Sequence, residues 1–238
     1  MLRDFVKKWS RKLGFEIVRY PNDHLLRRVK LYNHFMVDCL IDIGANQGQF
    51  ASLSRKLGFN GRIISFEPTS FAYQRLKANS QNDPSWECLN LGVGDKNEKA
   101  FINVSQNSVS SSLLDLEDSH KEAAPASTFE SREEIEVKTI DSLFPELGLQ
   151  QHRSIMLKLD VQGFEMMVLK GAENSLKDIV GIQLEMSLTE LYKGESLFDD
   201  MNAYIVSKGF DLYSLEPGFY DPESGRLLQV DGVYFKNR

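Results

Sequence analysis

The chain is poor in the residues and segments that mark several classes of protein. Only two cysteines, Cys39 and Cys88, occur in 238 residues, and they lack the spacing of a zinc site or a disulfide framework. No apolar run approaches the roughly 20 residues of a membrane-spanning helix, and no signal-peptide apolar region is present. We therefore expect two reduced core thiols in a cytoplasmic protein.

Histidine is also scarce, and acids outnumber basic residues by 34 to 28. The four histidines fall in the N-terminal segment or in expected loops, and we interpret His120 as a solvated loop residue. The formal net charge is −6, whereas a domain that binds nucleic acid generally carries a basic surface. We therefore expect no nucleic-acid partner.

Positive charge is concentrated at the N-terminus. Residues 1–30 hold nine Lys or Arg against three acids. Apolar residues at helical spacing alternate there with basic ones, which predicts an amphipathic helix over residues 2–20. We divide the chain into a basic helical leader, residues 1–35, and a domain, residues 36–238. The leader either packs on the domain, the favoured alternative, or touches an anionic membrane surface through residues 1–20.

The domain alternates apolar strands with helical segments. Such alternation predicts an α/β protein with a doubly wound, mainly parallel sheet. No helix separates the last two strands, so the final strand should be antiparallel. The seven expected strands are residues 37–43, 62–66, 86–91, 155–159, 180–184, 210–215 and 232–235.

The middle of the chain departs from this pattern. Residues 94–98 are rich in turn formers and predict a hairpin into a strand at residues 100–104. Residues 105–134 are serine-rich and show no sustained period, so we expect a long surface loop that acts as a lid. A short strand at residues 136–140 follows.

Acidic residues follow or end four of the expected strands: Asp42, Glu67, Asp160 and Glu185. Ligands of open parallel sheets bind outside the carboxyl ends of the strands. A buried strand has no structural reason to end repeatedly in charge, so the set predicts a binding site at this edge.

The loop after the first strand reads Asp42-Ile43-Gly44-Ala45-Asn46-Gln47-Gly48. A dinucleotide loop needs glycine where Asn46 stands, because the backbone must approach a pyrophosphate closely. Asp42 would also repel a phosphate. Glu67, 25 residues after Asp42, can accept both hydroxyls of a ribose. Adenosine with a cationic amino-acid tail meets these demands, which points to S-adenosylmethionine, whose carboxylate can take N–H groups at the next helix start.

These residues resemble a known family. The loop above, Phe66-Glu67-Pro68, Thr139-Ile140-Asp141, the stretch Lys158-Leu159-Asp160-Val161-Gln162-Gly163-Phe164-Glu165 and Leu169-Lys170-Gly171-Ala172 are similar to the FkbM family of S-adenosylmethionine-dependent methyltransferases. The resemblance implies a class I methyltransferase (Rossmann-like) sheet and O-methylation of a sugar, glycan or natural-product hydroxyl. Ser110-Ser111-Ser112-Leu113 also resembles a family feature and would line the substrate entrance.

The resemblance also implies roles for individual residues. Cofactor-binding residues would be Asp42, Gly44, Ala45, Asn46, Gly48, Glu67 and Pro68. The loop would hold the methionine end and Glu67 the ribose. Gln162 stands where the family commonly has Glu, which removes a charge near the site.

Methyl transfer to a hydroxyl needs a base within hydrogen-bond reach of the proton. Asp160 is the first candidate, with Glu165 and Glu185 as the others, and Lys158 is expected to share a face with Asp160 and position it. Lys158 could instead form a scaffold ion pair, and Glu165 could cap a helix.

Three other hypotheses stay open. Asp160, Glu185 and Asp231 could gather Mg²⁺ through oxygen ligands, an alternative that no histidine or cysteine supports. The same strand order could serve an NAD-dependent oxidoreductase, although Asn46 argues against it. A third hypothesis is a non-catalytic module that binds the cofactor.

Overall fold

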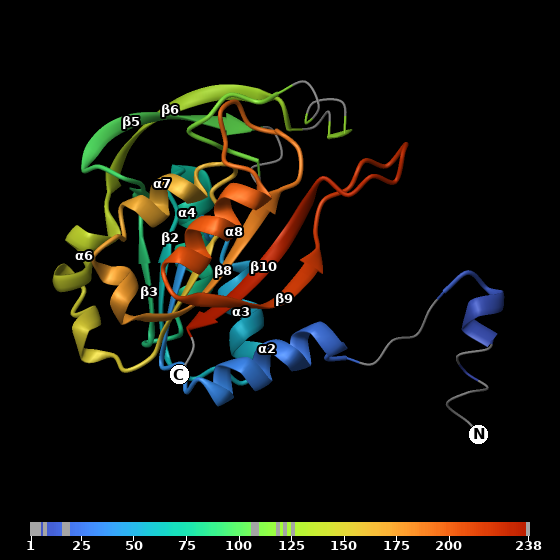
Figure 1. Ribbon diagram of the computed structural model, residues 1–238, viewed down its shortest axis with the longest axis horizontal. Helices are drawn as coiled ribbons and strands as arrows, with labels where there is room; N and C mark the ends of the chain where they lie inside the picture. Colours follow the sequence, from blue (N-terminus) through green and yellow to red (C-terminus); the bar gives the residue numbers. More distant parts are fainter. Residues whose placement is uncertain are drawn as a thin grey trace.

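The computed structural model describes residues 6, 9–15, 20–105, 110–117, 120, 123–124 and 127–236. Its larger sheet consists of β1 (Cys39–Ile43), β2 (Arg62–Phe66), β3 (Trp86–Leu89), β7 (Ile155–Leu159), β8 (Ile179–Ser187), β9 (Phe210–Pro217) and β10 (Gln229–Lys236). The strand order is β3-β2-β1-β7-β8-β10-β9 (Figure 1). β1 to β3, β7 and β8 are mutually parallel, and β10 runs antiparallel to both of its neighbours. This confirms the predicted doubly wound sheet of seven strands with an antiparallel last strand, the class I methyltransferase arrangement.

Helices cover both faces of this sheet. They are α2 (Asp23–His34), α3 (Gln49–Lys56), α4 (Ser70–Ser80), α6 (Ile140–Glu146), α7 (Glu165–Lys170) and α8 (Phe198–Ser207). One apolar cluster joins the sheet to α6, α7 and α8, and a second joins the other face to α2, α3 and α4. Parallel strands covered on both sides read as continuous apolar runs, which is why the central strands were recognisable in the sequence.

The alternation of side chains in the two central strands positions the site. Ile41 of β1 and Leu157 of β7 face the first cluster, and Leu40 and Met156 face the second. By the same alternation Asp42 and Lys158 both point to the second face, and they are register partners. A charged pair therefore lies inside an otherwise apolar layer.

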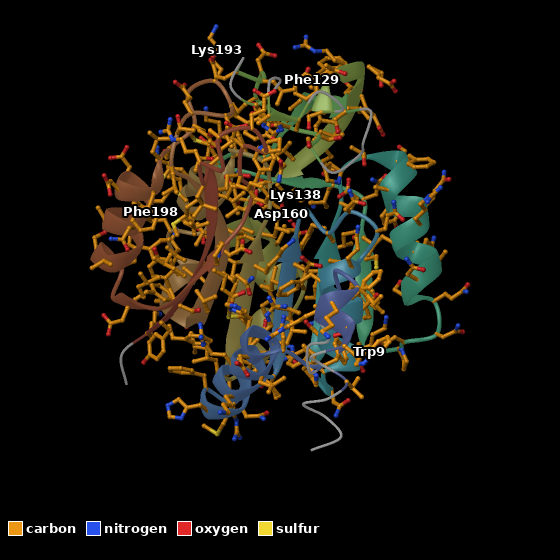
Figure 2. The ribbon with its side chains drawn as sticks, turned by 90° about the vertical axis from the view of Figure 1, so that its right-hand side faces the viewer. Trp9, Phe129, Lys138, Asp160, Lys193 and Phe198 are labelled. Carbon is orange, nitrogen blue, oxygen red and sulfur yellow. The ribbon has the colours of Figure 1, made fainter. Side chains whose placement is uncertain are left out.

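The smaller sheet corrects two predictions. It contains β4 (Gly92–Val93), β5 (Glu98–Ser105) and β6 (Phe129–Lys138) in the order β4-β6-β5. The predicted hairpin after the third strand is wrong, because β5 pairs antiparallel with the distant β6. The predicted loop over residues 105–134 therefore ends at Phe129, and β6 extends above the larger sheet in Figures 1 and 2.

The sequence of β6 explains the error. Six of its ten residues are charged, and four of these six are exposed, whereas Ile135 and Val137 are buried against Ile102 of β5. Acidic residues are poor strand formers, so the partner strand and the burial of one face decide the conformation.

The segment before the larger sheet is attached to it. Tyr32 of α2 is buried, and the ring of Phe35 stacks on that of Phe235 at 4.1 Å between centroids. Further toward the N-terminus, residues 9–12 are helical and stand apart from the domain in Figure 1. The predicted helix 2–20 is too long, because residues 13–15 and 20 are not helical. Residues 2–5, 7–8 and 16–19 of that prediction lie outside the described residues. No helix in the described part of the chain is long and apolar enough to cross a bilayer.

Candidate functional site

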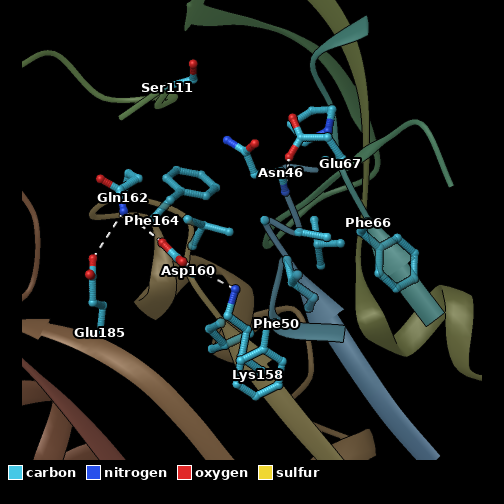
Figure 3. A pocket seen from close by; sticks show the side chains of 18 of the residues that line it. Asn46, Phe50, Phe66, Glu67, Ser111, Lys158, Asp160, Gln162, Phe164 and Glu185 are labelled. Atoms are coloured by element: carbon cyan, nitrogen blue, oxygen red, sulfur yellow. Dashed lines mark hydrogen bonds and ion pairs between the residues drawn. The ribbon is translucent and has the colours of Figure 1, made fainter. Parts of the chain in front are cut away.

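A cavity of about 410 Å³ opens at the carboxyl ends of β1, β2, β7 and β8 (Figure 3). It is within the size range of small-molecule sites. Eight of the residues predicted for the site line it: Gly44, Ala45, Asn46, Glu67, Pro68, Lys158, Asp160 and Glu185. Asp42, Gly48 and Glu165 are not among the lining residues. Most, but not all, of the residues named therefore line one cavity at this edge of the sheet.

The glycine loop is folded tightly against the neighbouring strand ends. The N–H groups of Gly44 and Ala45 donate to the carbonyl of Phe66 at 3.0 and 2.9 Å. Gly44 has a φ of +73°, and a Cβ there would lie 1.8 Å from the carbonyl oxygen of Asp160. Gly44 is thus required by a backbone approach between the ends of β1 and β7. Gly44 thereby holds the loop against the end of β7, at the wall of the cavity.

Gly48 has a different role. It has a φ of +84° and caps the start of α3, and a Cβ there would lie 2.7 Å from the Trp86 ring. Its position is set by packing under the loop, so direct contact of Gly48 with a ligand stays a prediction.

Glu67 is a fixed acceptor at the end of β2. One carboxylate oxygen accepts from the N–H of Asn46 at 2.8 Å, and the other accepts from the N–H and hydroxyl of Thr69 at 3.0 and 2.5 Å. Burial raises the pKa of Glu67, and these hydrogen bonds oppose the rise. A carboxylate has about four acceptor positions, and three are taken here. Glu67 therefore has one position left for a ribose hydroxyl, and it can accept from both hydroxyls of a vicinal diol when the Thr69 hydroxyl releases a second. The cavity and this acceptor fit the ribose of an adenosyl ligand.

Lys158 is buried between two carboxylates. Its Nζ lies 3.1 Å from Asp42 Oδ1 and 3.3 Å from Asp160 Oδ2. Burial alone lowers the pKa of Lys158, but the attraction of Asp42 and Asp160 outweighs burial and leaves it raised. Burial likewise raises the pKa of Asp42, but the ammonium at 3.1 Å keeps this carboxylate ionised, because a neutral Asp42 would leave a buried charge poorly compensated. The scaffold ion pair and the contact with Asp160 thus coexist.

Asp160 differs from Asp42 in being accessible. Its side chain is 39% exposed, whereas that of Asp42 is fully buried. Asp160 Oδ1 accepts from Gln162 Nε2 at 2.8 Å, so each oxygen of this carboxylate has one fixed donor (Figure 3). Carboxylate oxygens have further lone pairs, so Asp160 is oriented yet able to accept a proton.

Gln162 links Asp160 to the second acid of the cavity. The same Nε2 donates to Glu185 Oε2 at 3.1 Å, and Tyr192 donates its hydroxyl to Gln162 Oε1. Gln229 also donates to Glu185 Oε2, at 3.2 Å. Burial, followed by the charges of Asp160 and Asp231, raises the pKa of Glu185 well above its ordinary value, which favours the neutral acid. A glutamate in place of Gln162 would bring a third carboxylate to this point, so the amide suits this pair of acids.

Glu185 lies inside β8 rather than at its end, because the strand continues to Ser187. The alternation of side chains along β8 still directs Glu185 toward the cavity. The extension went unpredicted because the pairing with β10 that sustains it is non-local.

Glu165 does not face the cavity. It is the first residue of α7, is buried, and accepts from the N–H of Val161 at 2.9 Å. This is the capping role considered as its alternative. Its proposed part in catalysis stays a prediction that the geometry does not favour.

The described part of the expected lid contributes to the cavity wall. Ser111 and Ser112 line it, and Ser112 donates its hydroxyl to the carbonyl of Gln162 at 2.7 Å. His120 contradicts the prediction of a solvated loop residue. It is buried against the rings of Tyr192 and Phe219, and burial lowers its pKa to about 4, so its ring is neutral near pH 7.

Among the lining residues that the sequence analysis missed, three are polar or aromatic side chains from α2, α3 and β8. Arg28 comes from α2, Phe50 from α3 and Gln183 from β8. The guanidinium of Arg28 lies 4.7 Å from the Phe50 ring centroid. Arg28 was counted only as part of the basic leader, and no local motif marks its approach to the sheet.

The Mg²⁺ alternative gains no support. Across the described residues, no group of three or more His, Cys, Asp or Glu side chains is placed to hold a metal ion. The acids Asp160 and Glu185 are instead bridged by the amide of Gln162.

Comparison with known proteins identifies the class of this site. A family model described as the methyltransferase FkbM domain matches residues 42–212. The 2-O-methyltransferase NoeI of Sinorhizobium fredii is 26% identical over 162 residues, which cover 66% of this chain and 66% of NoeI. The methyltransferase sdnD of Sordaria araneosa is 25% identical over 196 residues, 73% of each chain.

Two solved structures show more distant likeness. Sp1610 of Streptococcus pneumoniae in complex with S-adenosyl-L-methionine has a TM-score of 0.47 and 12% identity, covering 89% of this chain and 73% of that chain. TehB of Haemophilus influenzae has a TM-score of 0.47 and 9% identity, covering 96% and 66%.

Glu165 provides a test of the site's electrostatics. Burial raises its pKa from 4.5 to about 7, so the folded protein binds a proton more tightly than the unfolded chain. The contribution of this protonation to the free energy of unfolding is fully present below about pH 4.5 and is lost as the pH rises toward 7. Glu165→Gln should therefore gain up to about 3 kcal/mol of unfolding free energy relative to the wild type between these pH values. Urea denaturation at several pH values measures the difference, and a pH-independent difference would contradict it.

Proposed function

The chain belongs to the FkbM family of S-adenosylmethionine-dependent methyltransferases, and from this premise we propose that it methylates a hydroxyl oxygen of a sugar, glycan or natural-product acceptor. Membership excludes the NAD-dependent oxidoreductase and the non-catalytic module considered from the sequence. The acceptor and the residue roles below are proposals.

Asp160 carries the proposal. Its side chain is 39% exposed, so a substrate can reach it in the cavity, and two donors, Lys158 and Gln162, fix its orientation. A general base must lie within hydrogen-bond reach of the proton that it removes. We assign Asp160 this role: it takes the acceptor's hydroxyl proton as the oxygen forms its bond to the methyl carbon.

The cofactor would supply an electrophilic methyl group bound to a positively charged sulfur. In the proposal Glu67 accepts from the ribose hydroxyls, and the loop from Gly44 to Asn46 lies under the methionine portion. The support is the prior fixation of Glu67 by Asn46 and Thr69 and the clearance created by Gly44. Rigid placement matters because in-line displacement depends on alignment and approach distance.

The other members of the network act on Asp160. Lys158 stabilises it as a carboxylate before the reaction, and Gln162 holds it relative to Glu185. A neutral Glu185 can donate to the acceptor, because its Oε2 already accepts from Gln162 and Gln229. The two acids would thus have different protonation states and different tasks.

A polyhydroxylated acceptor fits the polar wall of the cavity, to which Ser111, Ser112 and Gln183 contribute. The printed name of NoeI, a 2-O-methyltransferase, is consistent with this acceptor chemistry. Mass spectrometry of a carbohydrate extract incubated with methyl-labelled cofactor would identify the product.

Replacing the base tests the assignment. Asp160→Asn should lower kcat about 10²- to 10⁴-fold, because the amide cannot take a proton. The dissociation constant for S-adenosylhomocysteine should stay within about threefold. Asp211→Asn, an equal change of charge on the exposed side of β9, is the matched control and should keep the wild-type rate. Release of S-adenosylhomocysteine, with the carbohydrate extract as acceptor, measures the rates of both variants. An unaltered rate in Asp160→Asn would remove Asp160 from this role.

We further propose that the leader touches an anionic membrane surface of the cytoplasm. The support is exposure: Trp9 is 56% and Leu13 63% exposed, with Arg11 and Lys12 between them. Apolar and basic residues together suit an interface between lipid and water.

Vesicle sedimentation tests this contact. Vesicles with phosphatidylserine should sediment the wild-type protein, and Trp9→Asp should reduce binding at least about fivefold, because a carboxylate is repelled and cannot enter the interface. Phe101→Asp, at a site 60% exposed on the smaller sheet, is the control and should bind as the wild type does. Equal binding of Trp9→Asp would contradict the proposal.

A further inference from the structure

Arg28 is a cavity residue supplied from outside the larger sheet. It lies on α2, which packs on the sheet through Tyr32 and Phe35. Its guanidinium lies over the ring of Phe50, 4.7 Å from the centroid, and lines the same cavity as Asp160. This cation–π contact with Phe50 restricts the position of the guanidinium beside the cavity.

One nitrogen of this guanidinium lacks a hydrogen-bond acceptor. Arg28 Nη1 is buried and has no hydrogen-bond partner among the described residues. A buried charged donor without an acceptor is costly, and such groups in folded proteins generally have a partner. The neighbouring Arg27 does have a hydrogen-bond acceptor, because its Nη1 donates to Ser214 Oγ at 2.7 Å.

The charges around the cavity favour an anionic partner for Arg28. Among the described lining residues the cations are Arg28 and Lys158. Lys158 already contacts Asp42 and Asp160. Burial raises the pKa of Asp231, and the positive charge of Arg28 opposes this rise, so the two are neighbours, but no ion pair joins them among the described residues. Arg28 therefore remains available for an anionic group of a ligand.

The position of Arg28 identifies which anionic group. Phe50, on which it stacks, is the second residue of α3 and follows directly on the glycine loop. The first N–H groups of a helix lack internal partners and favour negative charge. A guanidinium and the start of α3 thus converge at the loop end of the cavity. Resting on the proposed function, we infer that Arg28 binds the α-carboxylate of the cofactor's amino-acid portion.

The inference makes α2 part of the cofactor site. Arg28 would read the carboxylate, and Glu67, across the glycine loop, would read the ribose. A shift of the Arg28 side chain that uncovers Nη1 would let such a carboxylate form a charge-assisted hydrogen bond with it. Binding of the cofactor would then also fix α2 against α3.

Two ligands that differ in the amino-acid portion test this assignment by calorimetry. S-adenosylhomocysteine contains the α-carboxylate, and 5′-methylthioadenosine lacks it. Arg28→Gln should weaken S-adenosylhomocysteine about 10- to 100-fold, the usual loss for a charge-assisted hydrogen bond, and leave 5′-methylthioadenosine within about twofold. Arg28→Lys should fall between the wild type and Arg28→Gln. Arg27→Gln, on the same helix, is the matched control and should bind both ligands as the wild type does.

Each other outcome overturns the inference. Equal weakening of both ligands by Arg28→Gln would mean that Arg28 only supports the fold, and circular dichroism and thermal melting would show the accompanying loss of structure. Unchanged binding of both would mean that the guanidinium holds no part of the cofactor. Failure of the wild type to bind S-adenosylhomocysteine would instead refute the proposed function itself.

Discussion

One buried ammonium group organises the site. Lys158 joins the end of β1 to the end of β7 through Asp42, and it reaches forward to Asp160 in the cavity. Removing one partner of a buried pair costs about 3–5 kcal/mol because the remaining charge is uncompensated. Such a pair adds little net stability compared with apolar residues, so its presence in the apolar layer between the sheet and α2 and α3 indicates a function. In the proposed function, Lys158 holds Asp160 in place next to a second acid.

A second constraint on the site is that Asp160 and Glu185 lie close together, where two negative charges would repel each other. Gln162 donates to both Asp160 and Glu185, and burial favours the neutral form of Glu185. Gln162 has a φ of +55°, a strained conformation that the contacts of its side chain and of Ser112 maintain. Tyr192 fixes the other end of the amide. Ser112, Gln162 and the two acids of the cavity are thereby parts of one hydrogen-bonded unit.

The features predicted correctly from the sequence are those marked by short local patterns. The predictions failed where contacts between segments far apart in the sequence decide the structure. The apolar runs at β1 and β7, the glycine loop and Glu67 at the end of β2 are all marked by short patterns. β6 could not be recognised, because its acidic residues are poor strand formers and β5 determines its conformation. His120 looked solvated because its partners Tyr192 and Phe219 come from segments far along the chain. Arg28 was missed for the same reason, since only packing of α2 brings it to the cavity.

The central claim is that the strand-end cavity holds an adenosyl ligand with its ribose at Glu67 and its sulfur toward Asp160. A crystal structure with S-adenosylhomocysteine tests it most directly. The account predicts both ribose hydroxyl oxygens within about 2.6–3.2 Å of the Glu67 carboxylate and the sulfur on the Asp160 side of the glycine loop. A nucleoside bound elsewhere, with Glu67 still contacting only Asn46 and Thr69, would contradict it.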